Sequence, residues 1–322
     1  MKIDELIEKI AQKDKKAIAR ALTEIENNSK FAQHIIDRIS PKFGHSYRIG
    51  ITGPPGAGKS TLTNALIKLL VSKNFHVGVI AIDPTSPFTG GALLGDRIRM
   101  SEIGTHPNVF IRSMASRGSL GGLSQFASEA GDIFDYAGFD FTIYETVGVG
   151  QSELDVANNV DTTVVVLVPE SGDSIQAMKA GLMEIGDIFV MNKSDRSGAD
   201  QAVASLQLIL SFKEHDENTW LPPIIKTIAS ENQGIEELYL KILDHKSFLE
   251  KTGQLYVKRQ LRFKNRIKDL ISNYLKKELW NSERIKLLDE KLQLIFENKE
   301  KVSNVVRDLV DNFRNGQQKY KL

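Results

Sequence analysis

Short apolar runs, separated by longer amphipathic stretches, mark the middle of the chain. The runs are rich in β-branched residues and only four to seven residues long, which is typical of parallel strands covered by helices on both faces. The intervening stretches are long enough to hold crossover helices, so residues 45–248 are expected to form an α/β, doubly wound and mostly parallel sheet. The expected strands are Tyr47–Thr52, Val77–Ile82, Val109–Arg112, Phe139–Glu145, Thr163–Val168, Ile188–Asn192 and Ile224–Ile228.

The two flanking segments show a helical pattern instead. In residues 1–44, apolar side chains recur at three- and four-residue spacing until Pro41 and Gly44 interrupt them, which predicts a helical N-terminal extension. Residues 249–322 hold no strand signal, and we expect a helical C-terminal arm that packs against a second copy of the chain. Two apolar stripes favour this arrangement: Leu261, Ile267, Leu270, Ile271, Tyr274 and Leu275, and Val302, Val305, Val306, Leu309, Val310 and Phe313.

Composition narrows the class of protein. The 322 residues include no cysteine, which excludes disulfides, zinc–thiolate sites and iron–sulfur clusters and favours a reducing cytoplasm. The first residues lack the pattern of a signal or transit peptide, and no apolar run approaches the roughly 20 residues that span a bilayer. The net charge is +1, and although residues 257–322 are basic, their acids and bases are interspersed. We therefore expect no membrane and no nucleic acid as partner.

A glycine-rich turn follows the first expected strand and precedes an apolar helical pattern. It fits the P-loop pattern G-x-x-x-x-G-K-[ST], whose backbone N–H groups and helix N-terminus hold phosphates. Lys59 is expected to reach the β- and γ-phosphates, and the Ser60 hydroxyl to bind magnesium. The expected phosphate-binding residues are Gly53, Pro54, Pro55, Gly56, Ala57, Gly58, Lys59, Ser60 and Thr61.

Asn192-Lys193-Ser194-Asp195 follows the sixth expected strand, at the edge where ligands bind in open α/β sheets. N-K-x-D reads guanine, because the Asp195 carboxylate can accept hydrogen bonds from guanine N1–H and its 2-amino group, a donor pair that adenine lacks. Lys193 is expected to lie along the base, and Asn192 to tie this loop to the P-loop. Ala229 and Ser230, after the last strand, are expected to contact the guanine carbonyl. The nucleotide is therefore expected to be GTP or GDP.

Four further residues are candidates for the magnesium ion and the γ-phosphate. Glu145 and Gly148 form an E-x-x-G at the end of a strand, where the carboxylate is expected to hold Mg²⁺ and the glycine N–H to approach the γ-phosphate. Asp83 ends a second strand near the same rim. Asp96 lies on a glycine-flanked loop and is expected to join the metal only when GTP is bound.

Hydrolysis of GTP also needs a positioned water. Many small GTPases carry a glutamine directly after D-x-x-G, but here Val149 stands in that place and Gln151 follows two residues later. We therefore expect GTP hydrolysis that is slow in the chain alone and faster with a partner.

Together these segments resemble the ArgK/MeaB GTPases, the methylmalonyl-CoA mutase-associated chaperones of the SIMIBI class of P-loop proteins. One departure is Ser113-Met114-Ala115, where the family pattern leads us to expect a proline-rich stretch. The segments that carry the resemblance are Gly53–Ser60, Asp83–Met100, Phe110–Leu123, Glu145–Glu153 and Asn192–Asp195.

The resemblance implies a homodimer joined through the C-terminal helices and a partner, an adenosylcobalamin-dependent acyl-CoA mutase such as methylmalonyl-CoA mutase. It implies that the GTPase gates loading of adenosylcobalamin into the mutase and protects it. It also places Asp83, Asp96 and Glu145 at or near magnesium, and Lys179 on a further switch loop, with Arg99 and Gln176 nearby.

Three alternatives remain at this point. The first is a GTPase that delivers a metal to another metalloenzyme, although the chain has no cysteine and only six scattered histidines. The second is an ATP-dependent, transport-linked kinase, against which the N-K-x-D segment argues. The third is a structural dimer with an idle nucleotide site.

Overall fold

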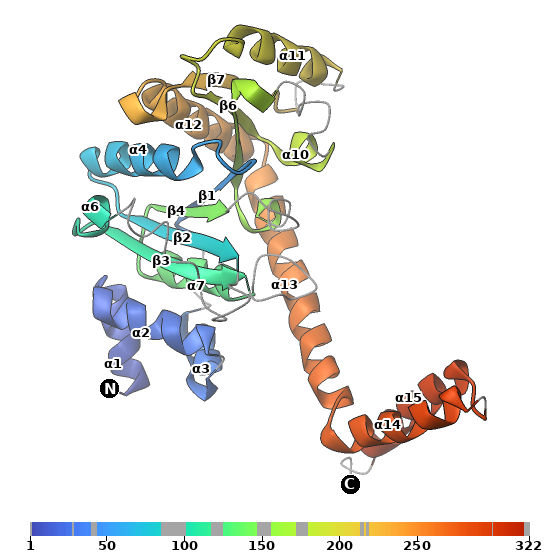
Figure 1. The fold of residues 1–322 in the computed structure, drawn as a ribbon. Helices are drawn as coiled ribbons and strands as arrows, with labels where there is room; N and C mark the ends of the chain where they lie inside the picture. Colours follow the sequence, from blue (N-terminus) through green and yellow to red (C-terminus); the bar gives the residue numbers. More distant parts are fainter. Residues whose placement is uncertain are drawn as a thin grey trace. The chain divides into compact units, whose positions relative to one another are not determined.

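A seven-stranded, all-parallel sheet forms the centre of the chain in this computed structural model (Figure 1). The strand order is β3-β2-β4-β1-β5-β6-β7. The strands are β1 Tyr47–Thr52, β2 Val77–Pro84, β3 Val109–Ser116, β4 Phe141–Thr146, β5 Thr162–Leu167, β6 Ile188–Asn192 and β7 Ile224–Thr227. The structure describes residues 2–27, 29–39, 44–84, 101–116, 125–146, 156–171, 180–212, 216, 219–297 and 299–318.

The doubly wound fold predicted from the sequence is confirmed, with all seven strands where the apolar runs lie. Only the strand ends differ. Strand β3 continues four residues beyond the expected Arg112, so Ser113–Ala115, where a proline-rich stretch was expected, pair in the sheet with β2. These three residues lie in register with Ala81, Ile82 and Asp83 of β2, and β3 is an edge strand of the sheet.

Helices cover both faces of the sheet, as the alternation along β5 requires (Figure 1). Val164 and Val166 pack with α4 and α12 on one face, whereas Val165 and Leu167 pack with α11 on the other. The described helices are α1 Ile3–Ala11, α2 Lys15–Glu26, α3 Lys30–Ile39, α4 Lys59–Ser72, α6 Ser101–Gly104, α7 Gln125–Tyr136, α10 Ala180–Ile185, α11 Ala199–Ser211, α12 Ile235–Lys251, α13 Gln254–Leu279, α14 Ser282–Phe296 and α15 Val302–Gln318.

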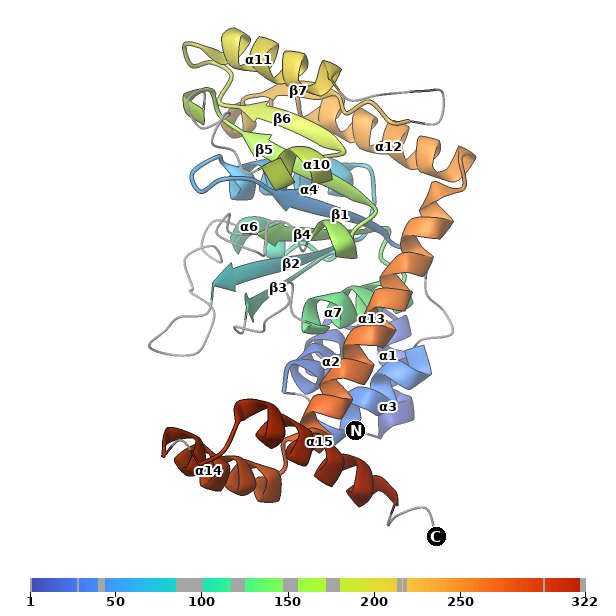
Figure 2. The ribbon, with the colours of Figure 1, turned by 90° about the vertical axis from the view of Figure 1, so that its right-hand side faces the viewer.

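The N-terminal helices α1, α2 and α3 lie against α7 and share one apolar core with it (Figure 2). Ile10, Ile18 and Leu22 from the predicted apolar pattern are fully buried in this core. Arg112 on β3 forms an ion pair with Glu26 on α2, both about one-fifth exposed. The extension is therefore packed onto the sheet domain and belongs to the same compact unit, Met1–Arg259.

A buried polar network lies at the amino-terminal ends of the central strands. The Nδ1 atom of His245 on α12 is 2.8 Å from Thr162 Oγ1, which is 2.6 Å from the Tyr47 hydroxyl. Trp220 packs its ring against His245 and donates to the Asp187 carbonyl at 2.7 Å. Burial lowers the pKa of His245 to about 4, so the imidazole is neutral at neutral pH and acts as a hydrogen-bonding group.

Residues Gln260–Leu322 form a second compact unit, and the division between the units lies within α13. In this unit α14 and α15 pack together, with Val305 and Leu309 buried and Lys291 paired with Asp308 at 2.9 Å. Among the described residues, no helix is long and apolar enough to cross a bilayer.

Candidate functional site

The turn between β1 and α4 has the backbone conformation of a phosphate-binding loop. Gly53, Gly56 and Gly58 have φ angles of 135°, 76° and 88°, which L side chains rarely adopt. Space is also limiting: a Cβ atom on Gly53 would lie 2.1 Å from the Val166 carbonyl oxygen, and one on Gly58 would lie 2.3 Å from Asn192 Nδ2. At these two positions glycine is required for both conformation and packing.

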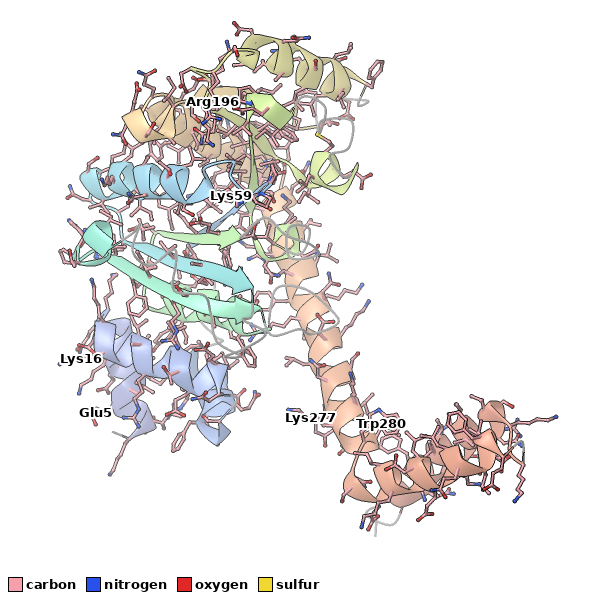
Figure 3. The ribbon with its side chains drawn as sticks, in the orientation of Figure 1. Glu5, Lys16, Lys59, Arg196, Lys277 and Trp280 are labelled. Atoms are coloured by element: carbon pink, nitrogen blue, oxygen red, sulfur yellow. The ribbon has the colours of Figure 1, made fainter. Side chains whose placement is uncertain are left out.

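Lys59 begins α4 and is buried beneath this turn (Figure 3). Its Nζ atom donates to the carbonyl oxygens of Gly53 at 2.9 Å and Pro54 at 3.0 Å. The ammonium group is thereby held beside the N-terminus of a 14-residue helix, whose first N–H groups and dipole attract anions. The arrangement suits the binding of a phosphate group.

Ser60 and Glu145 meet at the edge of the turn. The Ser60 hydroxyl donates to Glu145 Oε1 at 2.5 Å, and Glu145 pairs in register with Ile51, two residues before Gly53. A hydroxyl and a carboxylate are oxygen ligands of the kind that Mg²⁺ prefers, so these residues fit that ion. Within the described part of the chain, no three His, Cys, Asp or Glu side chains gather as a metal site.

Asn192 joins the turn to the end of β6. Its Nδ2 donates to the Ala57 carbonyl at 2.8 Å, and its Oδ1 accepts from Thr227 Oγ1 at 3.0 Å and from the Ala229 N–H at 3.1 Å. The side chain is 3% exposed, so these bonds are shielded from water. The predicted link between the N-K-x-D segment and the P-loop is present in the structure.

The rest of the N-K-x-D segment follows the end of β6. Lys193 has a left-handed φ of 55°, and its Nζ donates to the Gly56 carbonyl at 2.8 Å. Asp195 is exposed, two residues further along the turn. Of the pair predicted to contact the guanine carbonyl, Ala229 is buried and Ser230 is exposed.

Ser60, Glu145, Asn192 and Ala229 are thus joined by hydrogen bonds at the carboxyl ends of β1, β4, β6 and β7, as the strand order allows. For Asp83, the next-to-last residue of β2, the structure describes only the backbone, which lies opposite Ala115 on β3. The predictions for the following residues lie outside the described residues: Asp96, Arg99, Gly148, Val149, Gln151, Gln176 and Lys179.

Sequence reasoning missed two contacts at this edge. Arg196, directly after the N-K-x-D segment, forms an ion pair with Glu170, which follows β5 (Figure 3 labels Arg196). The hydrogen bond from Arg196 lowers the pKa of Glu170. Thr146 at the end of β4 donates to Thr52 Oγ1 at 3.1 Å, directly before the P-loop. The position of these residues at the carboxyl ends of parallel strands was the available signal.

Comparison with known proteins identifies the family. Residues 18–284 match the family model described as methylmalonyl-CoA mutase-associated GTPase MeaB. A relative from Pyrococcus abyssi is 52% identical over 275 residues, which cover 85% of each chain. The GTPase ArgK of Escherichia coli is 38% identical over 265 residues, 80% of each chain. A crystal structure titled LAO/AO transport system kinase aligns with a TM-score of 0.73 and 28% identity over 97% of both chains.

A GTPase family agrees with the phosphate-binding turn at Gly53–Ser60, with the buried Lys59 and with the N-K-x-D segment that Asn192 joins to this turn. The chain belongs to the MeaB family of methylmalonyl-CoA mutase-associated GTPases and is itself a GTPase.

Proposed function

We propose that this GTPase is the chaperone of an adenosylcobalamin-dependent acyl-CoA mutase, methylmalonyl-CoA mutase, and that GTP hydrolysis times loading of adenosylcobalamin into that enzyme and protects it. The observation that carries the proposal is the match of residues 18–284 to a family described as mutase-associated. A protein that times loading by GTP hydrolysis needs a nucleotide site that distinguishes GTP from GDP. The contact of Ser60 with Glu145 supports a metal position beside the phosphates, and the contact of Asn192 with the P-loop supports a base loop held next to them. We further propose that the protein acts in the cytoplasm.

Within the site we assign each group a separate task. Lys59 neutralises the β- and γ-phosphates, and the backbone N–H groups of Gly53–Ser60 bind phosphate oxygens. Ser60 and Glu145 hold Mg²⁺, which supplies charge neutralisation at the phosphates when bound, and Asp195 accepts hydrogen bonds from guanine. Asp83, Asp96, Gly148 and Lys179 remain proposed as further metal, γ-phosphate and switch residues.

Substitution of Asp195 tests the assignment of the base. Asp195→Asn replaces an acceptor by a group that can donate, so GDP affinity is expected to fall about 10- to 100-fold while affinity for the xanthine nucleotide rises. Calorimetry with GDP, xanthosine diphosphate and ADP measures the change. Asp200→Asn is the control, because Asp200 is an exposed acid on nearby α11. Unchanged GDP affinity in Asp195→Asn contradicts the assignment.

Substitution of Glu145 tests the metal assignment. Glu145→Gln keeps the shape but removes the charge, so the gain in GTP affinity on adding Mg²⁺ is expected to shrink by about 10-fold, with binding in EDTA little changed. Titration with a fluorescent GTP analogue, with and without Mg²⁺, measures this gain. Glu129→Gln, at a buried glutamate on α7, is the control. An unaltered Mg²⁺ effect in Glu145→Gln argues against the assignment.

We also propose that the C-terminal arm joins two copies of the chain. On α13 the predicted apolar stripe is exposed in the single chain: Leu261, Ile267, Leu270, Ile271, Tyr274 and Leu275 are between 36% and 62% exposed. Such a contiguous apolar surface is unfavourable in water and is typical of an interface.

A charge placed in this stripe is expected to separate the copies. Ile271→Glu puts a carboxylate at the centre of the apolar surface, so the mass measured by light scattering is expected to fall from two chains to one. Leu240→Glu is the control, because Leu240 on α12 is 50% exposed and outside the arm. A two-chain mass for Ile271→Glu places the interface elsewhere, and a one-chain mass for the wild-type protein contradicts the homodimer.

The mutase proposal is tested by binding and by rate. Purified methylmalonyl-CoA mutase is expected to co-purify with the tagged chain in at least one nucleotide state, GDP or a non-hydrolysable GTP analogue. It is also expected to raise single-turnover GTP hydrolysis at least about 10-fold, which corresponds to about 1.4 kcal/mol of barrier. If the mutase binds in neither state, or if the chain alone is already fast and the mutase changes nothing, the proposal is wrong.

A further inference from the structure

The first residues of α13, Gln254–Arg259, belong to the same compact unit as the sheet, and we refer to them as the arm root. Arg259 ends this segment and binds Asp161 with two parallel bonds, Nε to Oδ1 at 3.2 Å and Nη2 to Oδ2 at 2.8 Å. Asp161 is fully buried, and Arg259 is 19% exposed. A two-pronged guanidinium–carboxylate contact of this kind is both strong and fixed in direction.

The same guanidinium also holds the segment that leads into β1. Arg259 donates to the carbonyl oxygens of Gly44 at 2.5 Å and of Ser46 at 3.2 Å. The Asp161 carboxylate accepts the Arg48 N–H at 3.0 Å. The beginning of the central strand is thereby bonded to both members of the Arg259–Asp161 pair.

Lys258 bonds the arm root to the neighbouring strands as well. Its Nζ donates to the Asp161 carbonyl at 3.1 Å and lies 3.3 Å from Asp187 Oδ2. That carboxylate accepts the Thr163 N–H of β5 at 2.8 Å and precedes β6. Two successive basic residues therefore fix the arm root to the beginnings of β1, β5 and β6.

From Asp161 a packed path leads toward the nucleotide site. Val156 and Val160 are buried, and a Cβ atom on Gly50 of β1 would lie 2.9 and 3.1 Å from their methyl groups. Gly50 stands three residues before Gly53, the first residue of the P-loop. The block of Val156, Val160 and Asp161 thus contacts the strand that carries the P-loop on one side and the arm root on the other.

We propose that Arg259 and Asp161 couple the arm root to the nucleotide site, so that exchange of GDP for GTP changes how firmly α13 is held at its beginning. If Arg259 moved away from Asp161, the buried negative charge of Asp161 would lose its countercharge, which is costly. A displacement of the Val156, Val160 and Asp161 block is therefore expected to displace the arm root as well, and the reverse. Coupling of this kind is reciprocal: a change at the arm root alters the relative affinity for GTP and GDP by the same factor. The inference rests on the GTPase activity alone and not on the identity of the partner enzyme.

Hydrogen–deuterium exchange of the full-length protein, loaded with GDP or with a non-hydrolysable GTP analogue, tests the coupling. In the wild-type protein the backbone amides of residues 256–263 are expected to exchange about 5-fold faster in one nucleotide state than in the other. Equal exchange in the two states overturns the proposal without any variant.

Two variants then locate the coupling. Arg259→Gln is expected to abolish the difference in exchange and to shift the ratio of GDP to GTP-analogue affinity about 5-fold. Arg259→Lys keeps the positive charge but cannot form two parallel bonds to the carboxylate, so its effects are expected to lie between those of the wild-type protein and Arg259→Gln. Arg112→Gln is the matched control, because Arg112 is an equally buried arginine whose partner, Glu26, lies on α2.

The outcomes distinguish coupling from a purely structural ion pair. If Arg259→Gln lowers the melting temperature but leaves the nucleotide-dependent difference in exchange intact, or if Arg112→Gln removes that difference equally, the pair only stabilises the fold and the proposal is overturned. The purified chain suffices for every measurement, so failure of the mutase to bind leaves this test unaffected.

Discussion

One buried side-chain amide holds the nucleotide site together. Asn192 bonds simultaneously to the P-loop, to the last strand and to the turn that follows it. The P-loop follows β1, whereas Thr227 and Ala229 belong to β7 and the turn after it, and Asn192 itself ends β6. Because the amide is shielded from water, loss of any of these bonds leaves a buried polar group without its partner, which is costly. The relative position of the phosphate and base loops therefore depends on this residue.

The two ends of the sheet have different tasks. At the carboxyl ends, glycines, Lys59, Ser60 and Glu145 form the turn proposed to bind phosphate and magnesium. At the amino ends, Arg48 and Arg259 pair with buried carboxylates, and Lys258 pairs with the half-buried carboxylate of Asp187. The amino ends thus hold ion pairs between side chains of this chain, and the carboxyl ends hold the groups that we propose bind the nucleotide.

Local sequence patterns predicted the strands, the P-loop and the N-K-x-D segment, because each of these consists of one contiguous run of residues. Val164 and Val166 face one layer of helices and Val165 and Leu167 the other, so these four successive residues of β5 had to be apolar. The contact of Arg259 with Asp161 joins residues 98 positions apart, and neither has a local motif. Glu170 and Arg196 likewise meet only because β5 and β6 are neighbours in the sheet. Pairings of this kind follow from the strand order, which the sequence does not specify locally.

The boundary at Arg259 also bears on how such a protein can diversify. Among the described residues, the apolar clusters around the sheet are formed by the first unit, and the second unit has buried residues of its own, Val305 and Leu309 on α15. A different sequence from Gln260 onward would therefore leave the residues of these clusters around the sheet unchanged. The condition is that Lys258 and Arg259 are kept, because their bonds to Asp161 attach the beginning of α13 to the nucleotide-binding domain, whatever sequence follows.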